Sequence, residues 1–159
     1  MNSEEMLVAW LKDAYAMESA LVNNLNNHAK DAKGHPEIEA RIREHAAQTQ
    51  RHADLVRQCI ERHGQHPSAA KTMLGKVSGI FGNLHAATRD ESLKNCLMDV
   101  AVEHFEIACY KSLIAAARAV GDHQTAMVCE EILHEEQAMA DWLEQNIPAL
   151  TSEQLAMAH

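Results

Sequence analysis

The sequence predicts an all-α protein that folds as an antiparallel four-helix bundle. Two features of the composition favour helices over strands: the 159 residues include only three prolines and six glycines, and aromatic residues make up only 4%. The third observation is that four long segments carry apolar residues at helical spacing, the pattern of an amphipathic helix. At this length the chain is most simply one domain, residues 1–159, with enough residues for an ordinary core.

The first two helices are expected over roughly 4–31 and 37–63. Ser3 is the candidate N-cap of the first, and the two acidic residues that follow it favour a helix start. Gly34 marks the turn between the two helices. Pro36 suits the first turn of the second helix, because its missing N–H is not needed there. The short turn predicts an antiparallel hairpin.

The other two long helices are expected over roughly 90–120 and 123–145, the last one stopping before Pro148. Residues 68–85 contain a short apolar segment broken by glycines, which predicts a small helix within a connection. The link between residues 63 and 90 is long enough to cross the length of the bundle. One long crossover in a four-helix bundle is the ferritin-like arrangement.

Charge and composition argue against several classes of partner. The formal net charge of −9 disfavours a nucleic-acid-binding surface. No stretch approaches the roughly 20 apolar residues of a membrane span, and the first residues lack the features of a secretion signal. The four cysteines are widely spaced, as expected for buried thiols rather than a zinc or redox motif. A cytoplasmic protein without nucleic-acid or membrane partners is therefore expected.

Each of the four helices places ionisable or amide side chains on its apolar stripe. Examples are Glu18, between Ala14 and Leu21, and the pair Glu103 and Glu106. Burying an unpaired charge costs several kcal/mol, so such groups are usually neutralised, paired or bound to a metal. The combination on four helices predicts a metal site inside the bundle. The candidate ligands are Glu18, His45, Gln48, His52, Glu103, Glu106 and Glu135.

The ligand from the fourth helix stays open among four residues. Glu131 and His134 have the Glu-x-x-His spacing that bundles use for two-metal sites. Glu135 and Glu136 lie on the more apolar face instead. Glu135 is preferred because it lies four residues before Met139 on that face, and Glu136 ranks close behind.

Gln48 is the weak point of the predicted site. Carboxylates chelate and bridge hard cations such as iron or manganese, whereas an amide coordinates through oxygen but brings no charge. The anionic charge facing the centre is then lower than a full two-metal site would have. A single or weakly held metal ion, or a metal-free network of Glu, His, Gln and Tyr side chains, explains the same residues.

Four short motifs, one on each long helix, carry a family resemblance. They are Asp13-x-Tyr15-x-x-Glu18, His45-x-x-Gln48-Thr49, Glu103-His104-Phe105-Glu106-Ile107-Ala108-x-Tyr110 and Leu133-x-Glu135-Glu136. Over nearly the whole chain they resemble the YciF/YciE family of ferritin-like, stress-associated bacterial proteins. The resemblance implies a rubrerythrin- and ferritin-like bundle, a homodimer and a di-metal site, with no firmly established reaction.

The resemblance also indicates where this chain departs from the family. Carried over by position, the family's acids fall on Glu18, Glu103, Glu106, Glu135 and Glu136. The family pattern His-x-x-Glu-Thr meets Gln48 where the Glu is expected, and the family often has Gln where this chain has His52. Such an exchange either moves a ligand by one helical turn or marks a member that has lost its metal.

Two functions follow as hypotheses, and they leave open whether the protein is an enzyme. In the first, iron or manganese binds to Glu18, His52, Glu103, Glu106 and Glu135, with His45 and Gln48 as further ligands or as outer partners of the ligands. A redox-active metal would react there with oxygen or peroxide. In the second, the protein is a metal-free, non-enzymatic dimeric scaffold. Ferritin-style storage is least favoured, because nothing in the sequence indicates a cage.

Overall fold

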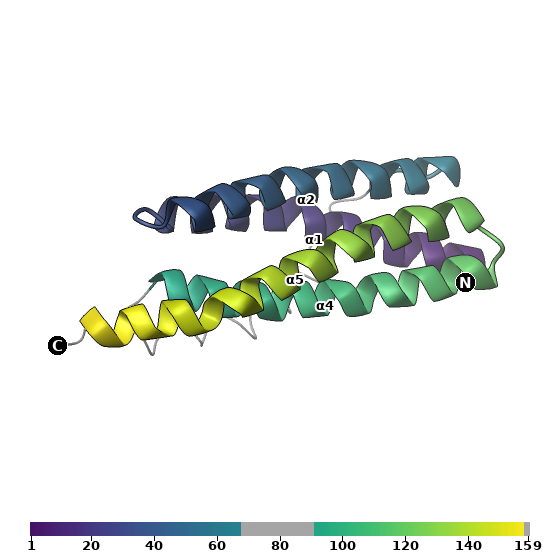
Figure 1. The fold of residues 1–159 in the computed structure, drawn as a ribbon. Helices are drawn as coiled ribbons and strands as arrows, with labels where there is room; N and C mark the ends of the chain where they lie inside the picture. The colour runs from purple at the N-terminus through teal and green to yellow at the C-terminus, as the bar shows by residue number, and fades with distance from the viewer. Residues whose placement is uncertain (68–90, 158–159) are drawn as a thin grey trace.

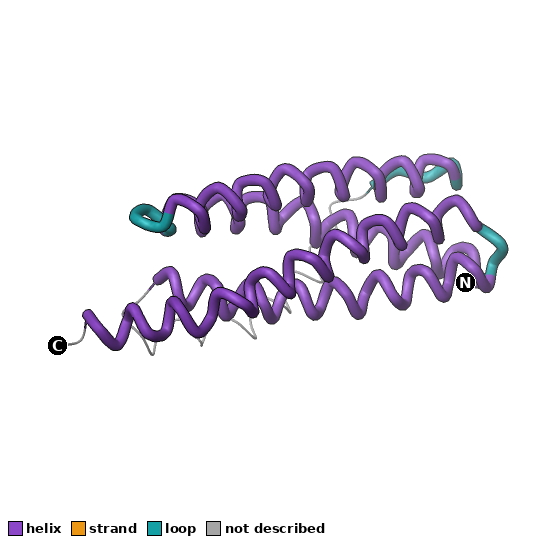
Figure 2. The backbone as a smooth tube through the Cα atoms, viewed as in Figure 1, coloured by secondary structure: helices purple, strands orange, loops and turns teal. Residues whose placement is uncertain are grey.

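The computed structural model describes residues 1–67 and 91–157, and this part of the chain forms four long helices. They are α1 (Ser3–Asp31), α2 (Pro36–Arg62), α4 (Glu91–Ala119) and α5 (His123–Met157). Helices and turns account for the regular structure of the described residues (Figure 2). The predicted all-α bundle is therefore confirmed. The small helix expected within 68–85 lies outside the described residues.

The helices form two hairpins, α1 with α2 and α4 with α5, which pack against each other (Figure 1). Helix α2 ends at the end of the bundle where the N-terminus lies, and α4 begins at the opposite end (Figure 1). Helices α2 and α4 therefore run in the same direction. This is the order of a ferritin-like bundle rather than of a simple up-down-up-down bundle.

Asn2, rather than Ser3, caps helix α1. The Asn2 side chain accepts a hydrogen bond from the Glu5 backbone N–H at 2.8 Å, and the Glu5 carboxylate accepts one from the Asn2 backbone N–H at 2.9 Å. This reciprocal pair is a capping box. The predicted cap was one residue too late, because Ser3 is already helical.

Helix α5 continues past Pro148, so its predicted end near residue 145 is wrong. A proline inside a helix cannot donate to the carbonyl four residues earlier, which here belongs to Glu144. Leu150, beyond the proline, is only 4% exposed and packs in the core. The burial of this side chain favours continuation of the helix, and the local proline signal was misleading.

Within the described residues, the apolar core consists of two clusters, one towards each end of the bundle, and both draw on all four helices. The cluster near the start of α5 includes Leu7, Leu11, Val56, Ile60, Leu113 and Ile132. The other cluster includes Leu25, Ile42, Cys96, Met139, Leu143 and Leu150. Buried polar side chains lie near the middle of each helix, where the two clusters meet, and on α1 the buried Glu18 lies between Met17 and Leu21 of the first cluster.

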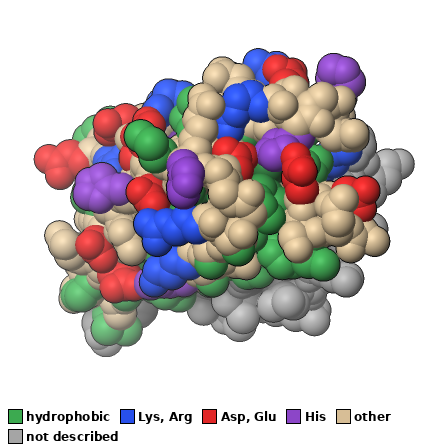
Figure 3. Space-filling model, turned by 90° about the vertical axis from the view of Figure 1, so that its right-hand side faces the viewer, with side chains coloured by type: hydrophobic (Ala, Val, Ile, Leu, Met, Phe, Trp, Pro, Cys, Tyr) green, Lys and Arg blue, Asp and Glu red, His purple; other side chains and the backbone are tan. Residues whose placement is uncertain are grey.

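The surface at one end of the bundle is charged and mixed (Figure 3). At the end of the bundle where α5 begins, acidic, basic and histidine side chains are interspersed (Figure 3). Among the described helices, none combines the length and the apolar character that crossing a membrane requires.

Candidate metal centre

A layer of buried ionisable side chains lies between the two apolar clusters. All four helices contribute to it, and each of its members is at most 2% exposed: Glu18, His45, His52, Glu103, Glu106 and Glu136. Burying this many charges is unfavourable unless they are paired, protonated or bound to a cation. The contacts within the layer decide between these states.

Glu18, His52 and Glu136 form a first group, whose potential ligand atoms lie within 4.8 Å of one another. His52 Nδ1 lies 2.7 Å from Glu136 Oε1 and 3.8 Å from Glu18 Oε2. The Tyr110 hydroxyl donates a hydrogen bond to Glu18 Oε1. Tyr110 therefore fixes the Glu18 carboxylate with its other oxygen on the side of His52.

His45, Glu103 and Glu136 form a second group of the same size. His45 Nε2 lies 2.9 Å from Glu103 Oε1 and 3.5 Å from Glu136 Oε2. Burial lowers the pKa of His45, which favours the neutral imidazole that a metal requires. Glu136 belongs to both groups, with one oxygen towards each histidine. A carboxylate placed in this way is suited to bridge two cations.

The second ring nitrogen of each imidazole contacts a side chain outside the two ligand groups. His52 Nε2 lies 2.7 Å from Glu135 Oε2, and His45 Nδ1 lies 3.2 Å from Gln48 Oε1. If these nitrogens carry the ring protons, His52 Nδ1 and His45 Nε2 are left with lone pairs towards the carboxylates. Metal-binding histidines almost always have such an outer acceptor.

Several atoms of the layer find no hydrogen-bond partner within the described residues. They are Glu18 Oε2, His52 Nδ1, Glu103 Oε2, Glu106 Oε1 and both oxygens of Glu136. His52 Nδ1 and Glu136 Oε1 are close, but they are not aligned for a hydrogen bond. Buried polar atoms are normally satisfied, so a set that faces a common space is what a bound cation would explain. The residues present therefore fit a metal centre.

The pKa values of the side chains in the layer indicate which of them favour the protonated form when no cation is bound. Burial raises the pKa of Glu18, and burial with the nearby Glu136 raises the pKa of Glu103 and Glu106 well above the usual range. Burial alone would lower the pKa of His52, but Glu136 and Glu18 raise it to about 10. Burial would raise the pKa of Glu136, but His52 lowers it overall. The metal-free layer thus favours an imidazolium at His52 beside Glu136 and disfavours ionisation of its other acids, and a cation would compete with these protons.

The structure brings four predicted ligands into the two groups: Glu18, His45, His52 and Glu103. Glu106 is buried in the same layer but belongs to neither group. Gln48 and Glu135 hold the imidazoles from outside, and the Glu135 side chain is 23% exposed. Whether any of these residues binds a metal stays a prediction.

Glu136 is the acid that α5 places at the centre, although the sequence analysis preferred Glu135 as the ligand from this helix. Glu131 and His134 are exposed, so the Glu-x-x-His pair faces away from the layer. A signal for Glu136 exists: it lies four residues after Ile132 and three before Met139, both fully buried. Residues at these spacings share one face of a helix.

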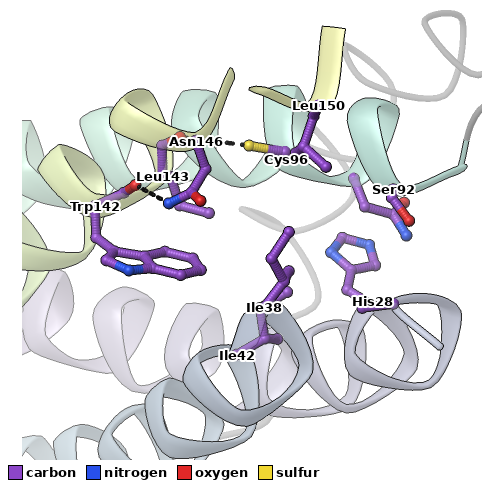
Figure 4. Close-up of a pocket in the computed structure, with 11 residues that line it drawn as sticks. His28, Ile38, Ile42, Ser92, Cys96, Trp142, Leu143, Asn146 and Leu150 are labelled. Carbon is purple, nitrogen blue, oxygen red and sulfur yellow. Dashed lines mark hydrogen bonds between the residues drawn. The ribbon is translucent and has the colours of Figure 1, made fainter. Parts of the chain in front are cut away.

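A small cavity of about 10 Å³ lies beyond the polar layer, beside the second apolar cluster. Figure 4 shows side chains from all four helices around it, among them His28, Ile38, Cys96 and Trp142. A cavity of this size holds about one water molecule, which is too little for a substrate. This cavity is therefore not a substrate site.

Comparison with known proteins agrees with this architecture. A protein from Xanthomonas campestris pv. campestris is 35% identical, with 99% of each chain covered and a TM-score of 0.86. The E. coli stress protein YciF is 20% identical, covering 96% of this chain and 98% of its own, with a TM-score of 0.83. A Desulfovibrio desulfuricans bacterioferritin described with a diiron site is 22% identical. The match covers 96% of this chain and 85% of the bacterioferritin chain, with a TM-score of 0.77. The last two likenesses show the fold alone.

The family assignment rests on the sequence as a whole. Residues 2–156 match the family model described as a domain of unknown function, DUF892. The expected resemblance to YciF and to ferritin-like bundles is confirmed. The chain therefore belongs to the DUF892 family, and it has the fold of YciF and of ferritin-like bundles.

Proposed function

We propose that this protein binds two iron or manganese ions in the buried layer between its hairpins. The observation that carries the proposal is Glu136, whose two carboxylate oxygens lie in two different ligand groups. Glu18 and His52 would complete one metal position, and His45 and Glu103 the other. Such a pair of ions, when bound, supplies redox chemistry towards oxygen or peroxide.

The type of ligand supports hard or borderline cations. Both groups found in residues 1–67 and 91–157 consist of carboxylates and imidazoles. Carboxylates suit manganese, imidazoles suit iron as well as zinc, copper and nickel, and the thiolates that iron–sulfur clusters need are absent from both groups. The diiron site described for the bacterioferritin of similar fold supports the same choice.

The chain's own residues would orient the ligands and exclude water. Tyr110 is fully buried and holds Glu18 by its hydroxyl group. The apolar clusters on both sides close the layer along the bundle. In such a low-dielectric space, the attraction between carboxylates and a cation is stronger than in water.

A second candidate function is a metal-free scaffold. The observation in its favour is the close pair of His52 and Glu136, 2.7 Å apart, which balances charge without a cation. In that case the polar layer serves specificity of packing, a role that buried polar groups have in some systems.

The elemental content of the protein decides between the two candidates. Protein purified without chelator or affinity tag is offered Fe(II) or Mn(II) anaerobically, desalted and analysed by plasma mass spectrometry. We expect about two ions per chain, as for a two-metal site. A value near zero would support the scaffold instead.

The variant Glu136→Gln tests the bridging assignment. Loss of one carboxylate shared by both positions should reduce the content to well below one ion per chain. The matched control is Glu130→Gln, because Glu130 lies on the same helix, is 44% exposed and pairs with Arg118 at the surface. If Glu136→Gln retains the wild-type metal content, Glu136 is not the bridging ligand.

A further inference from the structure

The two imidazoles of the candidate centre are held by chemically different partners. His52 Nε2 lies 2.7 Å from a carboxylate oxygen of Glu135, whereas His45 Nδ1 lies 3.2 Å from the amide oxygen of Gln48. A carboxylate behind a histidine fixes its tautomer and raises its strength as a ligand. An amide fixes the tautomer but adds no negative charge.

Glu135 is itself fixed by a contact at the surface. The Arg51 guanidinium bonds to Glu135 Oε1, and its other terminal nitrogen lies 2.6 Å from Glu131 Oε1. Arg51 offsets one of the two carboxylates that it contacts, so the trio keeps one negative charge behind His52. With one oxygen on Arg51 and the other on His52, Glu135 is held as an outer partner.

The surroundings of His45 are less favourable for a cation. Arg41 lies near enough for its positive charge to disfavour further positive charge on His45. Besides Glu103, α4 places a second acid, Asp99, near His45, but Asp99 is hydrogen bonded to His28 at 2.7 Å. The carboxylate of Asp99 is therefore partly compensated, and the amide of Gln48 adds no charge.

We propose that Glu135, oriented by Arg51, is a positioning residue that makes the His52 metal position the tighter of the two, so that the two positions fill in a fixed order. The proposal rests on the proposed two-metal function and adds an order of filling to it. Glu135, predicted from the sequence as a ligand, acts through His52 instead. Gln48, also predicted as a ligand, acts through His45 in the same way, but it strengthens His45 as a ligand less than Glu135 strengthens His52.

An anaerobic titration with Mn(II) tests the order, with free Mn(II) followed by electron paramagnetic resonance. For the wild type we expect two steps that differ roughly tenfold or more in affinity, in the range of effects known for outer partners of metal-binding histidines. Glu135→Gln should weaken the first step by roughly 10- to 100-fold and leave the second unchanged. Gln48→Glu should tighten the second step and bring the two steps together.

Glu131→Gln is the matched control for Glu135→Gln. Both acids lie on α5 and contact Arg51, but of the two only Glu135 is hydrogen bonded to His52. Glu131→Gln removes the same charge from the trio but keeps the hydrogen bond to His52, so it should weaken the first step less than Glu135→Gln does. A purely structural role of Glu135 would weaken both steps together.

Cobalt(II) provides a second readout that a structural defect would not reproduce. In the Co(II)-loaded protein, the proton on His52 Nε2 should give a paramagnetically shifted NMR signal that exchanges slowly with water. Glu135→Gln should make this proton exchange faster.

Two Mn(II)-binding steps of equal affinity in the wild type, or an unchanged first step in Glu135→Gln, would overturn the order of filling while leaving the metal site intact. A wild type that binds no Mn(II) would overturn the two-metal function itself.

Discussion

Glu106 is an acid of the buried layer that belongs to neither of the two ligand groups. Its side chain is 2% exposed, and Oε1 has no hydrogen-bond partner in the part of the chain that the structure describes. An unsatisfied buried carboxyl group destabilises the folded state. In the metal-free protein no cation offsets this cost.

The variant Glu106→Gln should therefore stabilise the metal-free protein. We expect the free energy of unfolding at pH 7 to rise by about 1 kcal/mol or more, because burial raises the pKa of Glu106 well above its usual range, and folding then requires a proton that glutamine does not need. Urea unfolding of chelator-treated protein measures this change. Glu144→Gln, an exposed change on α5, should stay within about 0.5 kcal/mol of the wild type. An equal or lower stability of Glu106→Gln would contradict the proposed cost.

Much of the centre was predictable from single positions. Glu18, His45 and His52 stand where an apolar residue is expected, and the structure places all three in the ligand groups. The choice between Glu135 and Glu136 was not predictable in the same way. Neighbouring residues lie about 100° apart around a helix, and the rotation of α5 against α2 decides which one faces the layer.

At the scale of helices, a network of side chains joins three helix ends near the start of α5. Asp122 accepts a hydrogen bond from the Thr125 backbone N–H at 3.0 Å, so it caps α5. His63, just after α2, contacts Asp122 Oδ2 and Glu4 Oε1, each at 2.9 Å. Glu4 lies in the first turn of α1. The network thus connects both hairpins at this end of the bundle.

The cap at Asp122 should make stability sensitive to acid. Partial burial alone would raise the pKa of Asp122, but hydrogen bonds from Thr125 and His63 lower it to about 2. A depressed pKa means that the ionised form stabilises the fold. This contribution is fully present above the usual value near 3.8 and is lost as the pH falls through about 2.

Two variants separate the cap from its charge. Asp122→Ala should lose about 1 kcal/mol of stability at pH 6, because alanine cannot cap the helix. Asp122→Asn should lose less, because asparagine is an equally good N-cap. The difference between wild type and Asp122→Asn should shrink as the pH falls from 4 to 2, measured by urea unfolding at each pH. A difference that is constant over this range would show that the charge of Asp122 does not contribute.

Helix boundaries were predictable where the local chemistry is decisive. Pro36 begins α2 as the sequence predicts, since a proline fits the first turn. The end of α5 was not predictable in this way, because the burial of Leu150 favours a longer helix whereas Pro148 locally indicates a helix end. Tertiary packing is not visible in a window of a few residues.

At the scale of the whole molecule, packing is much more extensive within each hairpin than between the hairpins. The candidate centre lies across this weaker interface. Glu18, His45 and His52 come from the α1–α2 hairpin, whereas Glu103 and Glu136 come from the α4–α5 hairpin. Bound cations would therefore join the two halves of the bundle at its middle.

Metal binding should stabilise the molecule and couple its two hairpins. At a free concentration of one hundred times its dissociation constant, each ion contributes about 2.7 kcal/mol. For a chain of this size that contribution corresponds to a rise in Tm of about 5–10 °C. Hydrogen exchange should slow most at the amides around the ligands in all four helices, because opening one hairpin from the other would then require release of the ions. The variant Glu136→Gln, given the same Mn(II), should show neither the rise in Tm nor the slower exchange. Slower exchange confined to one hairpin would place the cation outside the interface between the hairpins.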